Sequence, residues 1–290
     1  KSKLSKQEVD EIILGQVLTA GLGQNPARQA AIKAGIPKEK PAYVVNQVCG
    51  SGIRSVVSGY QSLSSGNSKV VIAGGQENMS LAPHAIHLRD GKKLGDAKLI
   101  DTMIKDGLWD AFHGYHMGVT AENVAEKFQI TREQQDKFAL RSQEKALNAQ
   151  KQKRFQDEIM NFKITANKAE INFNKDEHPR EGINLDALSR LKPVFKKDGT
   201  VTAGNASGIN DGAAAVILMT ADEAEKKNKQ KLVSIKSWAS CGVDPALMGT
   251  GPIPSSKKAL ELAGWDIKDV DLFEINEAFA AQSLAVLKTL

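Results

Sequence analysis

The chain carries Asn46-Gln47-Val48-Cys49-Gly50-Ser51-Gly52 between two segments with different hydrophobic periodicities. Residues 41–45 include Tyr and two Val, which is typical of a buried strand. Residues 53–63 repeat apolar side chains at helical spacing. The pattern predicts Cys49 on a strand-to-helix turn, where unpaired N–H groups and the helix dipole favour a thiolate. Such a thiolate is a nucleophile suited to acyl transfer; a small buried hydrophobe is the alternative.

Strands and helices alternate along the first part of the chain, which indicates an α/β fold with a largely parallel sheet buried on both faces. Strands are predicted over 11–17, 41–48, 69–75 and 210–219, with a helix over 27–35 that Pro26 opens.

The segment from Met79 to about Gly204 is more polar and has no comparable strand, so we expect an insertion over the sheet. Helices are predicted over 121–127 and 132–153, the second capped by Thr131, with loops over 172–180 and 196–200.

The last part of the chain again shows sheet and helix signals. Strands are predicted over 232–241 and 271–275, and helices over 221–227, over 255–263 with Ser255 as cap, and from Asn276 onward. Cys241 falls on a predicted strand and is expected to be a core residue.

Composition excludes several function classes. The 290 residues suit roughly two domains of ~150 residues each, and no run approaches the ~20 apolar residues of a membrane span. The net charge is +5, yet no helix combines Arg and Lys with aromatic residues, which argues against nucleic-acid binding. Two cysteines make no disulfide framework, so a reducing compartment is expected, and no metal-ligand spacing occurs.

Three other residues carry polar chemistry, each with a structural alternative. Asn276 can donate to an oxyanion or hold a water, or simply cap a helix. His116 can act as an acid/base or bond a substrate amide, or be a structural histidine. Ser207 lies in the small-residue loop 203–208, which either admits a thin ligand or is an ordinary turn.

Five segments taken together resemble the thiolase family, in its short-chain biosynthetic type. They are Asn46 to Gly52, Gly74-Gly75-Gln76-Glu77-Asn78-Met79-Ser80, Gly204-Asn205-Ala206-Ser207-Gly208-Ile209-Asn210-Asp211-Gly212, Gly251-Pro252 and Asn276-Glu277-Ala278-Phe279-Ala280. The resemblance covers nearly the whole chain.

The resemblance implies a five-layered α/β/α/β/α fold, in which two related halves stack and a loop domain is inserted into the first. The first half is expected at 1–80 and 209–229, the loop domain at 81–208 and the second half at 230–290. The second half and the first strand are expected to be incomplete in this chain.

The resemblance also implies a reaction: condensation of two acetyl-CoA to acetoacetyl-CoA and CoA, through an acetyl group on Cys49 and with no cofactor beyond CoA itself. Asn276 would position a water at the thioester oxygen. His116 and Ser207 would line the pantetheine channel and Arg180 would meet the nucleotide of CoA. The apolar walls of that channel would be Leu108, Met117 and Phe279.

The chain departs from the family where thiolases carry a Gly-His-Pro segment and a Cys-x-Gly segment, because it ends before both. It is expected to be either part of a complete thiolase or, if whole, a CoA-binding module at best. Degradative thiolysis of longer 3-ketoacyl-CoA chains is a further alternative. A cytoplasmic location is expected, and residues 87–103 resemble the loop that joins dimers into a homotetramer.

Overall fold

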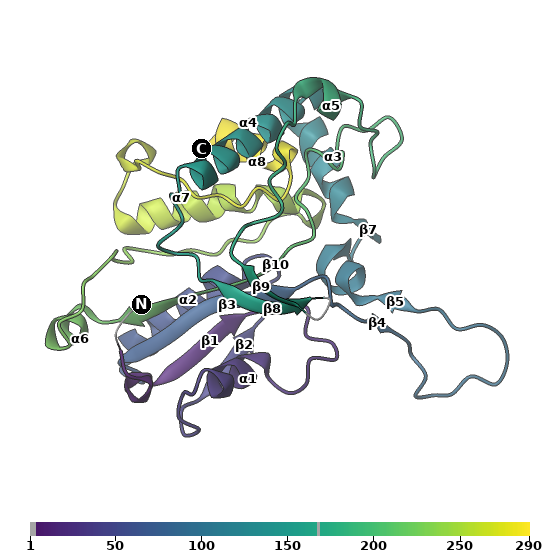
Figure 1. Cartoon of the computed structure of the whole chain (residues 1–290). Helices are drawn as coiled ribbons and strands as arrows, with labels where there is room; N and C mark the ends of the chain where they lie inside the picture. Colours follow the sequence, from purple (N-terminus) through teal and green to yellow (C-terminus); the bar gives the residue numbers. More distant parts are fainter. Residues whose placement is uncertain (1–3, 167–168) are drawn as a thin grey trace. The chain divides into compact units, whose positions relative to one another are not determined.

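The computed structural model describes residues 4–166 and 169–290 (Figure 1). These residues form two compact units, each built from segments that are distant in sequence. Unit 1 comprises Lys1–Trp109 and Ile209–Trp238, and unit 2 comprises Asp110–Gly208 and Ala239–Leu290. The domain boundaries expected from the family stay predictions.

A four-stranded sheet organises unit 1, and its strand order is β10-β3-β1-β2. β1 is parallel to both of its neighbours, β2 and β3, as the sequence predicts. β10 pairs antiparallel with β3 in a nine-residue register from Asp211↔Asn78 to Met219↔Val70. The strands are β1 (Glu11–Gly15), β2 (Ala42–Val45), β3 (Val70–Asn78) and β10 (Asp211–Met219).

Two helices that the sequence predicts, α1 and α2, pack on this sheet. The helices of unit 1 are η1 (Lys6–Glu8), α1 (Pro26–Lys33), α2 (Ser51–Ser64), the π-helical turn η2 (Met103–Leu108) and α6 (Ala221–Lys226). One core cluster joins the β1 side chains Ile12 and Leu14 to Ala27 and Ala31 of α1. Gly15 lets β1 approach α2 closely, since a Cβ there would lie 2.3 Å from the carbonyl carbon of Ser51.

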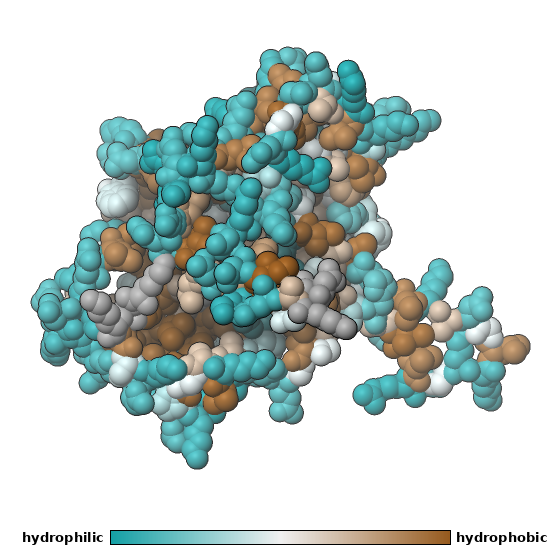
Figure 2. Space-filling view, viewed as in Figure 1, coloured by the Kyte–Doolittle hydropathy of each residue, from teal (hydrophilic) through white to brown (hydrophobic). Residues whose placement is uncertain are grey.

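Unit 1 also contains a long connection between β4 (His84–Ala85) and β5 (Ile100–Asp101), which pair antiparallel. In Figure 1 this β4–β5 connection, residues 86–99, extends away from the sheet. Figure 2 shows hydrophobic residues on it among polar ones, and Leu94 is 93% exposed.

Unit 2 is mainly helical. Its helices are α3 (Met117–Lys127), α4 (Arg132–Lys151), α5 (Leu185–Ser189), η3 (Pro245–Thr250), α7 (Pro252–Ala263), η4 (Ile267–Asp269) and α8 (Ala280–Thr289). Its strands are the short pair β6 (Trp109–Asp110, which begins at the end of unit 1) and β7 (Tyr115–His116), and the hairpin of β8 (Phe162–Ala166) and β9 (Ala169–Phe173). Thr131 caps α4 as predicted, because its side chain accepts from the Gln134 N–H.

Buried Val124 and Ala125 of α3 pack against Ala281 and Ala285 of α8, and this contact forms a core cluster of unit 2. It joins a helix from the middle of the chain to the last helix.

The strands predicted over 232–241 and 271–275 are wrong, because these residues form no ladder in the described part of the chain. Alternating side chains make a strand only where they pair in register with a neighbouring strand, and the described residues show no such pairing for these two segments. Cys241 is accordingly half-buried in irregular structure and is not a core residue.

Several local boundaries also differ from the predictions. The last helix begins at Ala280, with Phe279 at its N-cap, so Asn276 lies in the preceding loop and caps nothing. α7 starts at Pro252, which places Ser255 inside it, where its hydroxyl donates to the Gly251 carbonyl. The predicted loop 172–180 begins inside β9, because cross-strand pairing extends that strand to Phe173.

Candidate active site

Cys49 lies on the tight turn between β2 and α2, as the sequence predicts. Two side chains fix the turn. The Asn46 Oδ1 accepts from the Val48 N–H at 2.9 Å, and the Ser51 hydroxyl accepts from the Gln47 N–H at 2.8 Å. The Ser51 hydroxyl also donates to the Val48 carbonyl at 2.6 Å. Cys49 is therefore exposed immediately before Gly50, the N-cap of α2.

Val48 holds a strained backbone conformation immediately before Cys49. Its φ is +47°, in the left-handed region that β-branched residues rarely adopt. Strain of this kind costs on the order of 1–2 kcal/mol and persists only where the surroundings impose it. The hydrogen bonds of Asn46 and Ser51 supply that constraint.

The expected lowering of the Cys49 pKa is wrong in direction. The protein atoms packed around the sulfur desolvate it and raise the pKa of the Cys49 thiol above its ordinary value of 9.0. The Cys49 N–H acts in the opposite direction and is outweighed. Cys49 is exposed by surface area but desolvated at its sulfur, so at neutral pH the resting group is a thiol that needs a base.

In unit 2, an aromatic cluster gathers residues from three separate segments. The His116 ring stacks on Phe195 with centroids 4.6 Å apart and an interplanar angle of 14°. The ring of Phe195 meets Phe279 edge-on at 6.4 Å. Met117 packs against the same buried cluster. Three of the predicted channel residues, His116, Met117 and Phe279, are thus brought together.

His116 is a neutral hydrogen-bond donor in this arrangement. Its Nδ1 accepts from the Gly118 N–H at 3.0 Å, which caps α3 and places the ring proton on Nε2. Desolvation lowers the pKa of His116 below its ordinary value of 6.5. The ring can therefore donate to a carbonyl at neutral pH, and it accepts a proton less readily than a free histidine.

The loop that carries Ser207 is fastened to the segment before α8. The Ser207 N–H donates to the Ala278 carbonyl at 3.0 Å, and the Ala280 N–H donates to the Asn205 carbonyl at 2.9 Å. Ala206 forms an antiparallel bridge with Phe279. The loop thus joins the aromatic cluster, with Ser207 exposed beside it.

The other predicted site residues lie outside this cluster. Leu108 is half-buried at the end of η2 in unit 1. Arg180 is exposed, and its backbone N–H donates to Gln143 Oε1 at 2.9 Å. Asn276 is exposed in the loop before α8.

The chain matches two family models along nearly its whole length. Residues 1–222 match the family described as "Thiolase, N-terminal domain", and residues 229–290 match "Thiolase, C-terminal domain". The chain belongs to the thiolase family. The resemblance, the fold class and the enzyme class expected from the sequence are confirmed.

Several similar proteins share the name acetyl-CoA acetyltransferase. "Acetyl-CoA acetyltransferase" of Rhizobium meliloti (strain 1021) is 62% identical over 98% of this chain and 72% of its own length. "Acetyl-CoA acetyltransferase, cytosolic" of Rattus norvegicus is 53% identical over 100% of this chain and 74% of its own. The crystal structure of the Bacillus anthracis acetyl-CoA acetyltransferase superposes with a TM-score of 0.95 at 45% identity, covering 98% of this chain and 72% of that one.

Three residues in or beside the aromatic cluster are not among the site residues predicted from the sequence. Phe195 lies in a short segment without periodicity, so no local signal marks it. Glu122 carries a usable signal, because it falls on the buried face of α3 with Gly118 and Ala125, where a carboxylate is out of place. Asn205 stands out in the sequence only as a member of the small-residue loop 203–208.

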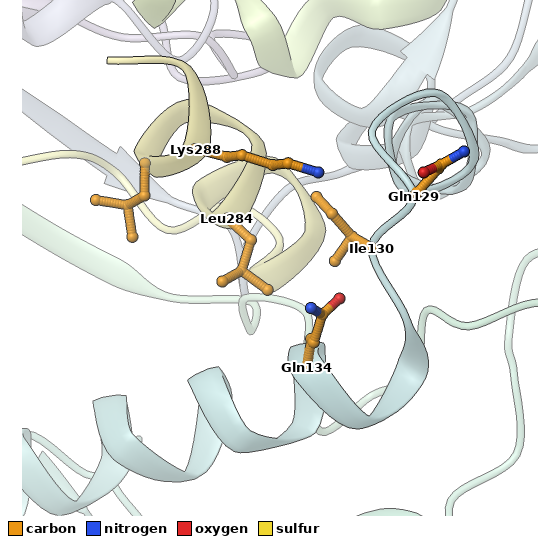
Figure 3. Close-up of a pocket in the computed structure, with 6 residues that line it drawn as sticks. Gln129, Ile130, Gln134, Leu284 and Lys288 are labelled. Carbon is orange, nitrogen blue, oxygen red and sulfur yellow. The ribbon is translucent and has the colours of Figure 1, made fainter.

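A cavity of about 340 Å³ lies elsewhere in unit 2 of this thiolase (Figure 3). Leu284, Leu287 and Lys288 of α8 line it together with Gln129, Ile130 and Gln134. Lys288, its one ionisable lining residue, donates to the Phe128 carbonyl at 3.1 Å. This cavity contains none of the predicted site residues.

Residues 4–166 and 169–290 contain no cluster of three His, Cys, Asp or Glu side chains that could hold a metal ion. Within the same ranges, every helix is too short or too polar to cross a bilayer.

Proposed function

We propose that this thiolase joins two molecules of acetyl-CoA to give acetoacetyl-CoA and CoA, through an acetyl group carried on Cys49. The observation that carries the proposal is the identity of 53–62% to proteins named acetyl-CoA acetyltransferase, over nearly the whole chain. The exposed Cys49 on a constrained turn supports it, because an acyl-transfer nucleophile has to be accessible and fixed.

The proposed reaction has two steps. In the first, the Cys49 thiol gives its proton to a base, and its sulfur attacks the acetyl carbon. The bond from that carbon to CoA sulfur breaks, and CoA leaves with a proton. In the second, a base removes an α-proton from another acetyl-CoA, and the enolate carbon attacks acetyl-Cys49. A carbon–carbon bond forms, the bond to Cys49 breaks and the thiol is restored.

The cluster in unit 2 is proposed to hold the pantetheine arm of CoA. His116 would donate from Nε2 to an amide carbonyl of that arm, since its lowered pKa keeps it neutral. Ser207 would bond the same arm from the fastened loop, while Met117 and Phe279 would contact its apolar part. Arg180 and Leu108 stay proposed CoA contacts, and Asn276 stays the proposed holder of a water at the thioester oxygen.

Brief exposure to acetyl-CoA followed by intact-mass measurement and peptide mapping tests the first step. We expect one acetyl group on Cys49, no label in Cys49→Ser, and full label in Cys241→Ser as the matched control. Acetyl label that survives in Cys49→Ser would refute the assignment. Turnover that rises with the acyl length of 3-ketoacyl-CoA would favour degradative thiolysis, and CoA binding without any label would favour a CoA-binding module.

We further propose a homotetramer that uses the β4–β5 connection, and a cytoplasmic location. The exposed leucines of that connection support the first, because exposed apolar side chains favour contacts between subunits. The rat relative is named as a cytosolic enzyme, which supports the proposed cytoplasmic location. Sedimentation of Leu94→Asp should show smaller assemblies than the unaltered chain, and identical sedimentation would count against the tetramer. Cell fractionation tests the location.

A further inference from the structure

Glu122 is a buried carboxylate without a cationic partner. It is only 4% exposed, on α3, and in the described part of the chain no Lys, Arg or His forms an ion pair with it. Burying an unpaired charge is costly unless hydrogen bonds replace the lost water. A helix position on a core face would therefore be more stable with an apolar residue, unless the carboxylate has a specific task.

The carboxylate of Glu122 accepts hydrogen bonds from two successive residues of one segment, residues 199–202, which we call the 199–202 turn. It accepts from the Thr200 N–H at 2.8 and 3.0 Å, from the Thr200 hydroxyl at 2.8 Å and from the Val201 N–H at 2.8 Å. Gly199 leaves room for it, since a Cβ there would lie 2.3 Å from Glu122 Oε1. Two successive residues of the turn are thus fixed against α3.

Asn205 connects that turn to the Ser207 loop and to α8. Its Nδ2 donates to the Thr200 carbonyl at 3.1 Å, and its Oδ1 accepts from the Thr202 N–H at 2.8 Å. Its own carbonyl accepts from the Ala280 N–H at 2.9 Å. Hydrogen bonds therefore run without a break from Glu122 through Thr200 and Asn205 to the residue that follows Phe279.

The neighbouring buried carboxylate, Asp136, has a different environment. It pairs with Arg132 at 2.8 Å and accepts from Asn205 Nδ2 at 2.9 Å, so its charge is balanced. Arg132 also donates to the carbonyls of Leu188 and Leu191. Asp136 has the environment of a structural ion pair, whereas Glu122 accepts from backbone N–H groups and the Thr200 hydroxyl, all of them uncharged donors.

We propose that Glu122 is a positioning residue for CoA, which sets the 199–202 turn so that Ser207 and Phe279 meet the pantetheine arm. The inference rests on the proposed function, because the ligand is the CoA of that reaction. Glu122 touches no substrate. It acts through Thr200 and Asn205, and a displacement of the turn moves both channel residues together.

The test is Glu122→Gln, which keeps the shape of the side chain but replaces one acceptor oxygen with an NH₂ that faces N–H donors. The matched control is Glu126→Gln, one turn along the same helix, where the exposed carboxylate meets Lys196 at 3.4 Å. We expect Glu122→Gln to bind CoA about tenfold more weakly in calorimetry, as expected for lost contacts to a buried group, with Glu126→Gln unchanged.

A second readout separates positioning from general loosening. With acetyl-CoA, the KM of Glu122→Gln should rise about tenfold while kcat stays close to that of the unaltered chain. Labelling of Cys49 by S-ethyl thioacetate, which has no pantetheine arm, should keep its rate. If labelling by this small donor falls as much as labelling by acetyl-CoA, the role of Glu122 is merely structural.

Should Glu122→Gln fail to fold, Thr200→Val removes one contact of the same carboxylate, and CoA binding should still weaken by about threefold. Unaltered CoA binding in the foldable variant overturns the positioning role alone. Failure of the unaltered chain to bind CoA overturns both this inference and the proposed function.

Discussion

Gly118→Ala should disturb the aromatic cluster and reduce stability, although alanine is the better helix former. Gly118 is buried in the first turn of α3, and a Cβ there would lie 2.2 Å from Cγ and Cδ2 of Phe195 and 2.4 Å from Cε2. Ordinary contacts of a Cβ lie at 3.4–4 Å, so the ring has to move by more than an ångström. That movement breaks its stack on His116 and its edge contact with Phe279.

The expected cost follows from two opposed effects. Overpacking costs about 1–3 kcal/mol, and each aromatic pair lost adds about 0.5–1.5 kcal/mol. The gain in helix propensity from Gly to Ala returns at most about 1 kcal/mol. We therefore expect the free energy of unfolding to fall by about 1–5 kcal/mol, and CoA binding to weaken because His116 and Phe279 lose their contacts with the displaced ring.

The assay is urea unfolding of Gly118→Ala, Phe195→Ala and the double variant, with Gly52→Ala as control. Gly52 is likewise the second residue of a helix, and a Cβ there meets nothing within 4 Å, so that variant should be neutral or more stable. In the double variant the new Cβ occupies space vacated by the ring. The loss of stability in the double variant should therefore be smaller than the sum of the two single-variant losses by about 1 kcal/mol or more. Additive costs would refute the argument that the two residues compete for one space.

Three further outcomes follow from the structure. In a Cys241→Ala background, alkylation of Cys49 by iodoacetamide should rise with pH to a midpoint above 9.0, and a lower midpoint would show that the helix N-terminus prevails over desolvation. Val48→Asn should raise the free energy of unfolding by about 1 kcal/mol, because Asn tolerates a positive φ. Val194→Asn is the control, since Val194 is a similarly exposed valine without a positive φ. An equal effect in both variants would contradict the conclusion that Val48 is strained. The folded-state pKa of His116 is lower than its unfolded value of 6.5, so the unfolded chain binds the proton first and the free energy of unfolding should fall as pH drops below 6.5. Denaturation measured from pH 7.5 to 5 should show a weaker pH dependence of this free energy in His116→Gln. An unchanged pH dependence in that variant would assign the loss of stability to other groups.

Local patterns predicted the parts of the fold that local interactions determine. β1, α1, α2 and the Cys49 turn follow from hydrophobic period, Pro26 and the position of glycines, all within short windows. The same kind of pattern predicts strands over 232–241 and 271–275 wrongly, because these segments pair with no neighbouring strand among the described residues. The antiparallel direction of β10 also has no local signal, because it depends on how the chain returns to β3.

The candidate site divides in the same way. Cys49, His116 and Ser207 stay predictions that each rest on a distinctive segment of sequence, whereas Phe195 contacts His116 only through folding across 79 residues of sequence. The sign of the Cys49 pKa shift illustrates the limit for energies. Helix-terminus electrostatics can be inferred from sequence, but desolvation depends on the atoms that pack around the sulfur, and here desolvation is larger.

The two pKa shifts together restrict the roles of Cys49 and His116. Desolvation raises the pKa of the thiol and lowers that of the imidazole, so each group is held in its neutral form at pH 7. A neutral His116 whose Nδ1 is occupied by Gly118 is a poor general base but a good donor from Nε2. His116 is therefore suited to donate a hydrogen bond rather than to take up a proton, and in the proposed reaction the Cys49 thiol would give its proton to a separate base.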